Sequence, residues 1–454
     1  MTDLLKQHEN ITDEFIDSLD QGNWTDIKQY LKSLHAADIA DVIEAIPRDM
    51  RELVWKQVDI SVMGEVLLSL HGEVRQQIIS ITSDDEMLQA LQLLQLDEIA
   101  DLDDDLPVSM VDAMVAAMDT SRRERYQAVK SYPDDTAGGL MDIDAVAVRA
   151  DVNMKAVLRF MQRTRNQLGS LPEHLDSLMV VDRNNTFLGT ISLGDVASLP
   201  TDMTVRHVMS TDLKGIPDKT SARQVARIFE DRDLLSAPVV DDNDRLLGRI
   251  TIDDVVDVMR EEAEQAVLSR AGLTTEVDMF APIVTSASRR AIWLGINLLT
   301  TFIAAWVIGL FESSIEKIVA LAVLMPVVAS MGGIAGTQTL TLVTRGMALD
   351  QIGQKNIWRL LKRELAQGLL NGIFWAFIVA AIAVLWFGDS QLGMIFGIAL
   401  ILNLITGALA GTLVPFTLHR IGIDPALAGG VVLTTATDVI GFLSFLGLAT
   451  LVLL

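Results

Sequence analysis

The sequence predicts a multidomain protein with a soluble front half, partly α-helical and partly α/β, and an all-α membrane domain at the rear. Half of the 454 residues are hydrophobic, and nearly all the long apolar runs lie after residue 285. Of the 60 acidic and 36 basic residues, only seven and nine lie from Thr285 onward, which leaves 53 acidic and 27 basic residues before it. The acidic part also contains two internal repeats. A chain of this length has room for two to four domains.

The negative charge of the front half limits its partners. An acidic surface repels nucleic acid, so nucleic acid is not expected as a partner and cations are the natural ones. Plain solubility is the alternative explanation of this charge. The chain has no cysteine, which excludes disulfides and thiolate metal sites. Its first ten residues lack a basic stretch followed by an apolar core, so no cleavable signal peptide is expected.

Five apolar segments are long enough to cross a hydrocarbon core of roughly 30 Å at about 1.5 Å per residue. They cover about residues 291–311, 318–343, 365–387, 392–418 and 426–454. The flanking basic residues predict their orientation. These residues fall on the side of the N-terminal half, and they are Arg289, Arg290, Arg345, Lys355, Arg359, Lys362, Arg363 and Arg420. The sequence therefore predicts an N-terminus inside, a C-terminus outside and an odd number of spans in a lipid membrane.

Asp438 lies about twelve residues into the fifth segment, near the middle of the predicted bilayer. A carboxylate at that depth costs several kcal/mol unless it faces water, a partner or an ion. Asp438 is therefore a candidate ion-binding residue, and a protonated or helix-capping aspartate is the alternative. Thr434 and Thr435 add hydroxyl groups nearby.

The second segment contains residues that weaken a helix. Pro326 removes a backbone donor, and three glycines lower helix stability and expose carbonyl groups. Irregular backbone at membrane depth is tolerated where it is buried in protein or lines a wet cavity, and close packing of small residues is the alternative. Polar residues at other positions favour a polar path through the helices. The polar residues are Gln338, Asn403, Thr406 and Asp438, and the three glycines are Gly332, Gly333 and Gly336.

Two repeats organise the acidic half. Residues 178–197 match residues 237–256 at an offset of 59, and each unit is predicted to form strand, turn, strand and the start of a helix. Residues 34–47 resemble residues 94–107 at an offset of 60, with a helical pattern that ends at a proline in both copies. The second repeat predicts a superhelix of short paired helices.

Carboxylates concentrate at three places in the acidic half. Asp97 and Asp101 are one helical turn apart, and Asp231 and Asp233 precede a strand of the second strand-rich unit. The third group follows the helix that leads to the membrane domain and consists of Asp253, Asp254, Asp257, Glu261, Glu262 and Glu264. Like charges at this density repel one another, unless a divalent cation bridges them. A solvated face is the alternative for any one group.

Four motifs resemble signatures of the MgtE family of magnesium channels, and the strand-rich units resemble tandem cystathionine-β-synthase (CBS) domains. The motifs are YPDDTAGGLM, PVVASMGGIAGTQTLTLVTRG, DPALAGG and TTATDVIGF. The likeness covers almost the whole chain in the family's order. The resemblance implies an α-helical N domain, CBS domains 1 and 2, a connecting plug helix and a five-helix transmembrane domain. Their expected ranges are 1–132, 133–200, 201–258, 259–284 and 285–454.

The resemblance also implies a function. It predicts a homodimeric, Mg²⁺-selective channel for influx down the electrochemical gradient, closed by cytoplasmic Mg²⁺ and located in a bacterial-type cytoplasmic membrane. Asp438 matches the pore carboxylate, and the implied pore-lining residues are Gly332, Gly333, Gly336, Gln338, Thr434 and Thr435. The implied ligands of regulatory Mg²⁺ are Asp97, Asp101, Asp233, Asp254, Asp257, Glu262 and Asp424. CBS domains of some members bind ATP, but no residue here decides that point.

Two departures from the family pattern bear on selectivity and regulation. Ile334 stands where the family usually has asparagine, so an amide that could contact a hydrated ion is missing. Arg260, Gln265 and Ala266 stand where acids often lie in relatives. Sequence alone therefore leaves open whether Mn²⁺, Co²⁺ or Ni²⁺ passes the same pore.

Two other transport mechanisms and catalysis are the alternatives to a channel. A proton- or sodium-coupled transporter of broader specificity for Mg²⁺, Co²⁺, Mn²⁺ and Ni²⁺ is the main alternative, because Asp438 could carry a coupling ion. An ATP-driven pump is disfavoured, because DKTSA at 218–222 lacks the rest of the phosphorylation signature and no Walker motif occurs. The six histidines form no metal-ligand spacing and no Ser/His/Asp pattern is apparent, so no enzymatic activity is expected.

Overall fold

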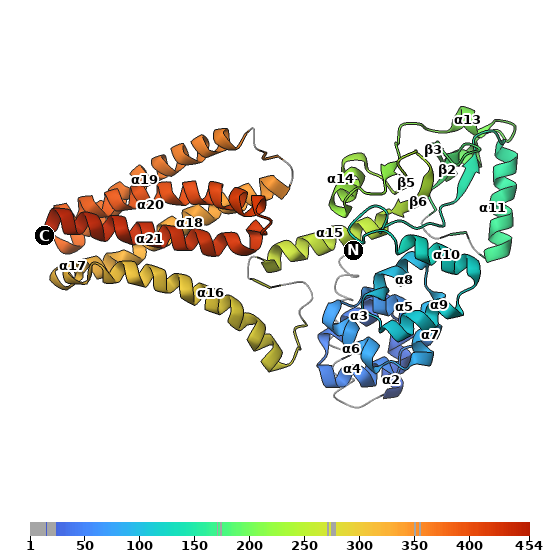
Figure 1. The fold of residues 1–454 in the computed structure, drawn as a ribbon, viewed down its shortest axis with the longest axis horizontal. Helices are drawn as coiled ribbons and strands as arrows, with labels where there is room; N and C mark the ends of the chain where they lie inside the picture. Colours follow the sequence, from blue (N-terminus) through green and yellow to red (C-terminus); the bar gives the residue numbers. More distant parts are fainter. Residues whose placement is uncertain are drawn as a thin grey trace. The chain divides into compact units, whose positions relative to one another are not determined.

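The computed structural model divides into two units, each with its own hydrophobic core (Figure 1). The structure describes Phe15 and residues 24–169, 171–172, 175–269, 272–273, 278–348, 351–353 and 356–454. The acidic unit comprises Met1–Glu264 and Thr275–Ala281. The membrane unit comprises Gln265–Thr274 and Pro282–Leu454.

The acidic unit begins with short helices of eight to ten residues each. They are α2 (Trp24–Leu31), α3 (Ala36–Ala45), α4 (Arg48–Trp55), α5 (Ile60–Ser69), α6 (Gly72–Ile81), α7 (Asp84–Leu93), α8 (Leu96–Asp103), α9 (Val108–Ala117) and α10 (Thr120–Val129). Side chains of Asp59, Ser83 and Asp119 accept backbone N–H groups and start α5, α7 and α10. Pro47 and Pro107 stand immediately before α4 and α9. The predicted α-helical N domain is confirmed.

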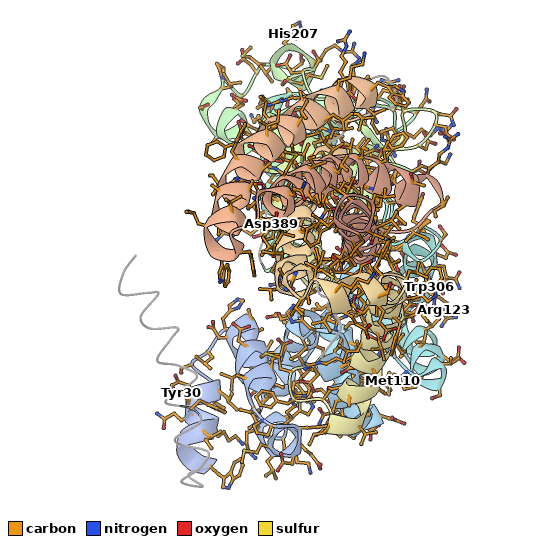
Figure 2. The ribbon with its side chains drawn as sticks, turned by 90° about the vertical axis from the view of Figure 1, so that its left-hand side faces the viewer. Tyr30, Met110, Arg123, His207, Trp306 and Asp389 are labelled. Carbon is orange, nitrogen blue, oxygen red and sulfur yellow. The ribbon has the colours of Figure 1, made fainter. Side chains whose placement is uncertain are left out.

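An arginine recurs at the same place in three helix pairs of this domain. Nε of Arg51 donates to the carbonyls of Ile43 and Ile46, at the C-terminus of α3. Arg75 likewise donates to carbonyls at the end of α5, and Arg123, labelled in Figure 2, to carbonyls at the end of α9. The last carbonyls of a helix lack partners within the helix, so each arginine satisfies the end of the preceding helix.

The next part contains two similar three-stranded sheets. Strands β1 (Ala147–Arg149), β2 (Ser177–Val181) and β3 (Phe187–Ser192) form one, in the order β1-β2-β3; β4 (Ile216–Pro217), β5 (Ser236–Val240) and β6 (Leu246–Thr251) form the other, in the order β4-β5-β6. In both sheets the first pair is parallel and the second antiparallel. The accompanying helices are α11 (Met154–Leu168), α12 (Leu193–Ser198), α13 (Val205–Val208) and α14 (Ala222–Arg232).

The offset of 59 residues is visible in the structure. Oδ1 of Asp182 accepts the N–H groups two and four residues later, and Oδ1 of Asp241 does the same in the second unit. Ser177 and Ser236, which are 59 residues apart, meet with their Oγ atoms at 3.2 Å. The predicted tandem α/β units are confirmed.

Helix α15 (Ile252–Leu268) follows β6 and carries the whole third acidic group. It is shorter than the connecting helix expected over 259–284, because residues 278–281 form a turn and Pro282 caps the next helix. Gly272 has a positive φ of 71°, which also interrupts helical backbone.

The membrane unit consists of long helices. They are α16 (Ile283–Gly309), α18 (Ala320–Ala348), α19 (Ile357–Phe387), α20 (Ser390–Arg420) and α21 (Pro425–Leu453), with the short α17 (Glu312–Lys317) between the first two. All five long helices are long and apolar enough to cross a membrane, as predicted. Trp306 on α16 is 66% exposed, and the side chain of Asp389 caps α20; both are labelled in Figure 2.

Helix α18 runs without a break through Pro326 and its three glycines. Of the two alternatives for this segment, the structure shows close packing of small residues and no irregular backbone within α18. Small residues instead let α18 approach α20 closely: a Cβ on Gly407 would lie 2.7 Å from the Gly332 carbonyl, and one on Gly411 would lie 2.6 Å from the Gly336 carbonyl. This contact is the small-residue packing that stabilises helices in a membrane.

Candidate functional site

A cavity of about 430 Å³ lies beside Asp438, between α18 and α21. Its lining combines one carboxylate, three hydroxyl groups, one amide and small or apolar residues. The lining residues are Ala329, Ser330, Gly333, Ile334, Thr337, Gln338, Thr434 and Asp438.

Helix geometry places these residues together. Ser330, Ile334 and Gln338 follow one another at intervals of four on α18, and Thr434 and Asp438 do so on α21, so each set shares one helix face. The Thr337 and Thr434 hydroxyls donate to carbonyls four residues earlier in their own helices. Their oxygen lone pairs stay free to accept or to ligate. The pocket can therefore offer a negative charge and neutral oxygens to a cation.

The sequence-predicted pore residues fall on two faces. Gly333, Gln338, Thr434 and Asp438 line the pocket. Gly332 and Gly336 are buried on the opposite face of α18, where a Cβ on Gly332 would overlap the Asn403 amide. These two glycines pack helices together.

Other predicted polar residues of the membrane unit also have structural contacts. The Thr435 hydroxyl donates to the Val431 carbonyl and that of Thr406 to the Leu402 carbonyl. Asn403 is fully buried and its Nδ2 donates to the Val328 carbonyl, which ties α20 to α18. Asn403 thus contributes to packing, and none of these three lines the pocket.

Ser330 and Thr337 line the pocket but were not singled out from the sequence. Their signal was present: they lie four residues from Ile334 and Gly333, on the turns that carry the glycine motif. Hydroxyl residues in a membrane helix often bond their own backbone, so sequence alone did not distinguish them from the other threonines.

A second candidate site lies in the acidic unit, where carboxylates of α8 face those of α15. Burial, with the nearby charges of Asp142 and Asp254, raises the pKa of Asp97 to about 8. Burial and the adjacent Asp253 raise the pKa of Asp254 to about 7. Loss of water around Asp101, with the charge of Asp134, raises its pKa to about 6.

We call Asp97, Asp101, Asp134, Asp142 and Asp254 the acidic cluster. The structure thus brings together three predicted residues that are up to 157 positions apart in the sequence. Sequence reasoning missed Asp134 and Asp142, although Asp134 lies within the YPDDTAGGLM motif. Asp134 and Asp142 belong to the cluster through tertiary contacts, which no local sequence pattern indicates.

The other predicted regulatory residues have separate surroundings. Burial raises the pKa of the Asp257 carboxyl, which lies near Asp253 and Arg260. Glu262 accepts a hydrogen bond of 2.6 Å from Arg223. Asp233 ends α14 with a positive φ of 51°, and Asp424 caps α21 through the Ala426 N–H.

The donor chemistry of the acidic cluster fits a hard divalent cation such as Mg²⁺, which prefers oxygen ligands. The pKa values of Asp97, Asp101 and Asp254 are raised first by burial and then by neighbouring carboxylates. The charged forms of these three side chains are therefore destabilised, and a bound cation would stabilise them. Within the described ranges, no three Asp, Glu or His side chains are grouped closely enough to bind a metal ion directly. Mg²⁺ usually keeps several of its waters, so the cluster suits an ion bound partly through water.

Three family models match the chain in order: the MgtE intracellular N domain at residues 34–135, the CBS domain at 137–201 and 205–261, and the MgtE divalent cation transporter at 325–448. The magnesium transporter MgtE of Bacillus subtilis is 27% identical over 95% of both chains. That of Thermus thermophilus is 29% identical over 96% of this chain and 97% of its own. The chain belongs to the MgtE family. As a member of this family, the chain is a multi-pass membrane transporter and not an enzyme.

The solved structures include a related cytosolic domain. The cytosolic domain of the Mg²⁺ channel MgtE in complex with ATP is 27% identical, with a TM-score of 0.49, over 54% of this chain and 99% of its own.

Proposed function

We propose that this chain is a Mg²⁺ channel that admits Mg²⁺ down its electrochemical gradient and closes when cytoplasmic Mg²⁺ occupies the acidic cluster. The pocket beside Asp438 is the observation that carries this proposal. Full-length relatives named magnesium transporters support the choice of ion.

The pocket suits a hydrated ion. Mg²⁺ gives up its water reluctantly and commonly binds through one or two carboxylates. Asp438 supplies one carboxylate, while Thr337, Gln338 and Thr434 supply neutral oxygens that accept hydrogen bonds from the waters of the ion. Ile334, 56% exposed in the lining, supplies no ligand and leaves selectivity to charge and size.

The membrane potential is a sufficient driving force. It contributes about 2.3 kcal/mol per charge per 100 mV, hence roughly twice that for a divalent ion. Influx therefore requires no proton or sodium gradient. We further propose an N-terminus on the cytoplasmic side, a bacterial-type cytoplasmic membrane and a homodimer whose two copies each contribute one Asp438.

Closing follows from charge repulsion in the acidic unit. Without Mg²⁺ the carboxylates of α8 and α15 repel each other, and Mg²⁺ held by Asp97, Asp101 and Asp254 stabilises their close arrangement. The ion closes the pore only if it binds the closed state more tightly than the open one. Regulatory roles of Asp233, Asp257, Glu262 and Asp424, the domain limits given above, and ATP binding by the CBS pair stay predictions.

Mg²⁺ uptake into liposomes tests the function. We expect uptake driven by an inside-negative potential alone, lost in Asp438→Asn and kept in Asp389→Asn. The second variant is a matched control, because Asp389 caps α20 outside the pocket and asparagine caps equally well. Uptake that requires a proton or sodium gradient would instead establish the coupled transporter of broader specificity.

A further inference from the structure

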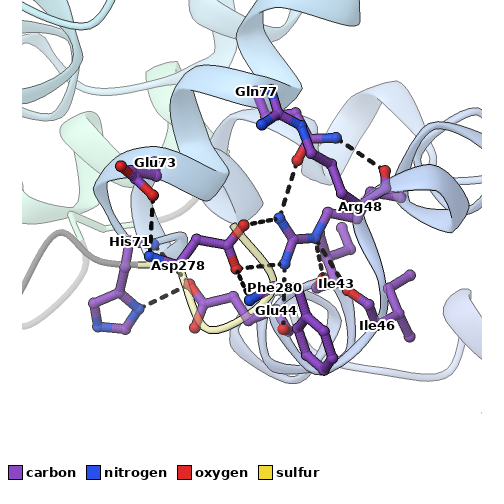
Figure 3. Close-up of polar contacts among 10 residues, drawn as sticks. Ile43, Glu44, Ile46, Arg48, His71, Glu73, Gln77, Asp278 and Phe280 are labelled. Carbon is purple, nitrogen blue, oxygen red and sulfur yellow. Dashed lines mark hydrogen bonds and ion pairs between the residues drawn. The ribbon is translucent and has the colours of Figure 1, made fainter. Parts of the chain in front are cut away.

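A buried ion pair joins the N domain to the chain just before the first membrane helix (Figure 3). The Arg51 guanidinium donates to both carboxylate oxygens of Asp278, at 2.6 Å from Nη1 to Oδ2 and 2.9 Å from Nη2 to Oδ1. The side chains are 0% and 5% exposed. Paired hydrogen bonds of this geometry are strong and directional.

The N domain prepares Arg51 for this contact. Its Nε is used at the end of α3, and Nη1 also donates to Gln77 Oε1 at 3.0 Å. Arg75, the equivalent arginine of the next helix pair, directs its spare nitrogen to Asp105 within the same domain, at 3.2 Å. Arg51 directs its spare nitrogens to a residue 227 positions further along the chain.

The partner segment is held at more than one atom. The Asp278 N–H donates to Glu73 Oε2, and the Phe280 N–H donates to Asp278 Oδ1. Burial opposes ionisation of Asp278, but the hydrogen bonds from Arg51 and Phe280 outweigh it and lower the pKa of this carboxyl. The pair is therefore charged, and removal of either partner leaves a buried charge without compensation.

The N domain also contacts Glu264, the last residue of the acidic unit before residues 265–274. His71 Nδ1 lies 2.8 Å from Glu44 Oε1, and its Nε2 lies 3.8 Å from Glu264 Oε2. The N domain thus holds the chain on both sides of residues 265–274.

We propose that the Arg51–Asp278 pair is a clamp through which the N domain acts directly on the first membrane helix, in addition to any action through α15. Only four residues separate Asp278 from Ile283, where α16 begins, and the five Cα–Cα steps between the two span at most about 18 Å. While the clamp holds, the N domain cannot leave the start of α16 beyond that reach. This inference rests on the proposed closing by Mg²⁺, and it makes Arg51 and Asp278 positioning residues of that step.

The test uses the full-length protein in liposomes and the cytoplasmic Mg²⁺ concentration that halves the flux. We expect Arg51→Met and Asp278→Asn each to raise this midpoint about tenfold, with flux at low Mg²⁺ unchanged, and the double variant to add nothing further. Arg123→Met is the matched control, because Arg123 satisfies a helix end inside the N domain and donates only to backbone carbonyls there, and it should leave the midpoint unchanged. An unshifted midpoint in Asp278→Asn, or an equal shift in Arg123→Met, would overturn the proposal.

A distance measurement tests the clamp even if cytoplasmic Mg²⁺ does not close the pore. The chain has no cysteine, so spin labels at Met279→Cys, 86% exposed, and Lys56→Cys, 61% exposed at its side chain, report only on this pair of positions. Labelled protein is diluted with unlabelled chain. We expect one narrow distance that broadens in Asp278→Asn. A distance distribution that stays unchanged in Asp278→Asn would overturn the clamp. If the distribution does broaden but Mg²⁺ does not close the pore, the clamp stands and only the proposed function is rejected.

Discussion

The membrane pocket and the acidic cluster both depend on carboxylates but hold them in opposite ways. Asp438 is the one acidic residue among eight that line the pocket, and its neighbours supply neutral oxygens. The acidic cluster gathers five aspartates, and burial together with neighbouring carboxylates raises the pKa of Asp97, Asp101 and Asp254. A lone carboxylate attracts an ion without holding it firmly, whereas crowded ones need a cation to lie together. The first arrangement suits passage and the second suits sensing.

The largest expected effect is on flux. At about 5 Å and an effective dielectric constant of about 40, a divalent ion gains roughly 3 kcal/mol from one carboxylate. Asp438→Asn should therefore reduce Mg²⁺ flux about 100-fold, measured as uptake into liposomes. Protection of the acidic unit from protease by Mg²⁺ should stay as in the unmodified protein. Loss of that protection as well would mean that the two sites are not separate.

Neutralising the acidic cluster should abolish closing by Mg²⁺ and leave Mg²⁺ flux through the pore intact. Replacing Asp97, Asp101 and Asp254 by asparagine removes the repulsion and the ligands together. We expect the cytoplasmic Mg²⁺ concentration that halves the flux to rise by more than about tenfold, or roughly 1.4 kcal/mol. Asp84→Asn, in the first turn of α7 outside the cluster, is the control. A triple variant that closes normally contradicts the sensing role.

Alanine substitutions at two adjacent glycines should distinguish the packing face of α18 from the face that lines the pocket. Gly332→Ala would press against the buried Asn403 and should destabilise the membrane unit by about 1–3 kcal/mol. Gly333→Ala meets only Thr437 Oγ1, at 3.9 Å, and should be neutral or stabilising by up to about 1 kcal/mol. Thermal unfolding in detergent measures both. Equal destabilisation would place Gly333 in a packing contact too.

The smallest effect concerns pH. Asp97, Asp101 and Asp254 have pKa values of about 6 to 8, above the ordinary 3.8, so the folded acidic unit binds more protons than the unfolded chain. Without Mg²⁺ its stability should therefore fall as the pH rises from about 4 to 8. Mg²⁺ should raise the unfolding temperature more at about pH 8 than at about pH 5.5.

The triple asparagine variant provides the control for this pH dependence. His71, whose pKa is raised by the Glu44 hydrogen bond, also loses its stabilising contribution as the pH rises. The pKa values of Asp134 and Asp257 are raised as well, so the triple variant should keep the smaller part of the slope that comes from these groups and lose the rest. An unchanged slope would assign the whole effect to groups outside the acidic cluster.

Much of the fold could be predicted because its signals are local. Apolar length gave the five membrane helices, and the offset of 59 gave the paired sheets, whose turns both depend on an aspartate at the same position. The sequence left irregular backbone and close packing of small residues open for α18, and the structure shows a continuous helix whose small residues pack against Gly407 and Gly411. Helix propensity describes single residues, so it cannot predict that contact between two helices.

The sites were predicted less completely for a similar reason. Helical spacing was enough for Asp438 and Gln338, but it did not tell which glycines of α18 face the pocket. Asp134 and Asp142 join the acidic cluster, and Arg51 reaches Asp278, only through contacts between distant segments. A single sequence carries no local sign of such contacts.

Single-channel recording from the purified protein in liposomes, with Mg²⁺ as the permeant cation, tests the central claim most directly. The cytoplasmic Mg²⁺ concentration is varied on the side of the acidic unit. We predict unitary currents that disappear as this concentration rises, that persist in the triple asparagine variant and that are absent in Asp438→Asn. Mg²⁺ uptake without unitary currents, or currents that ignore cytoplasmic Mg²⁺, would contradict the account.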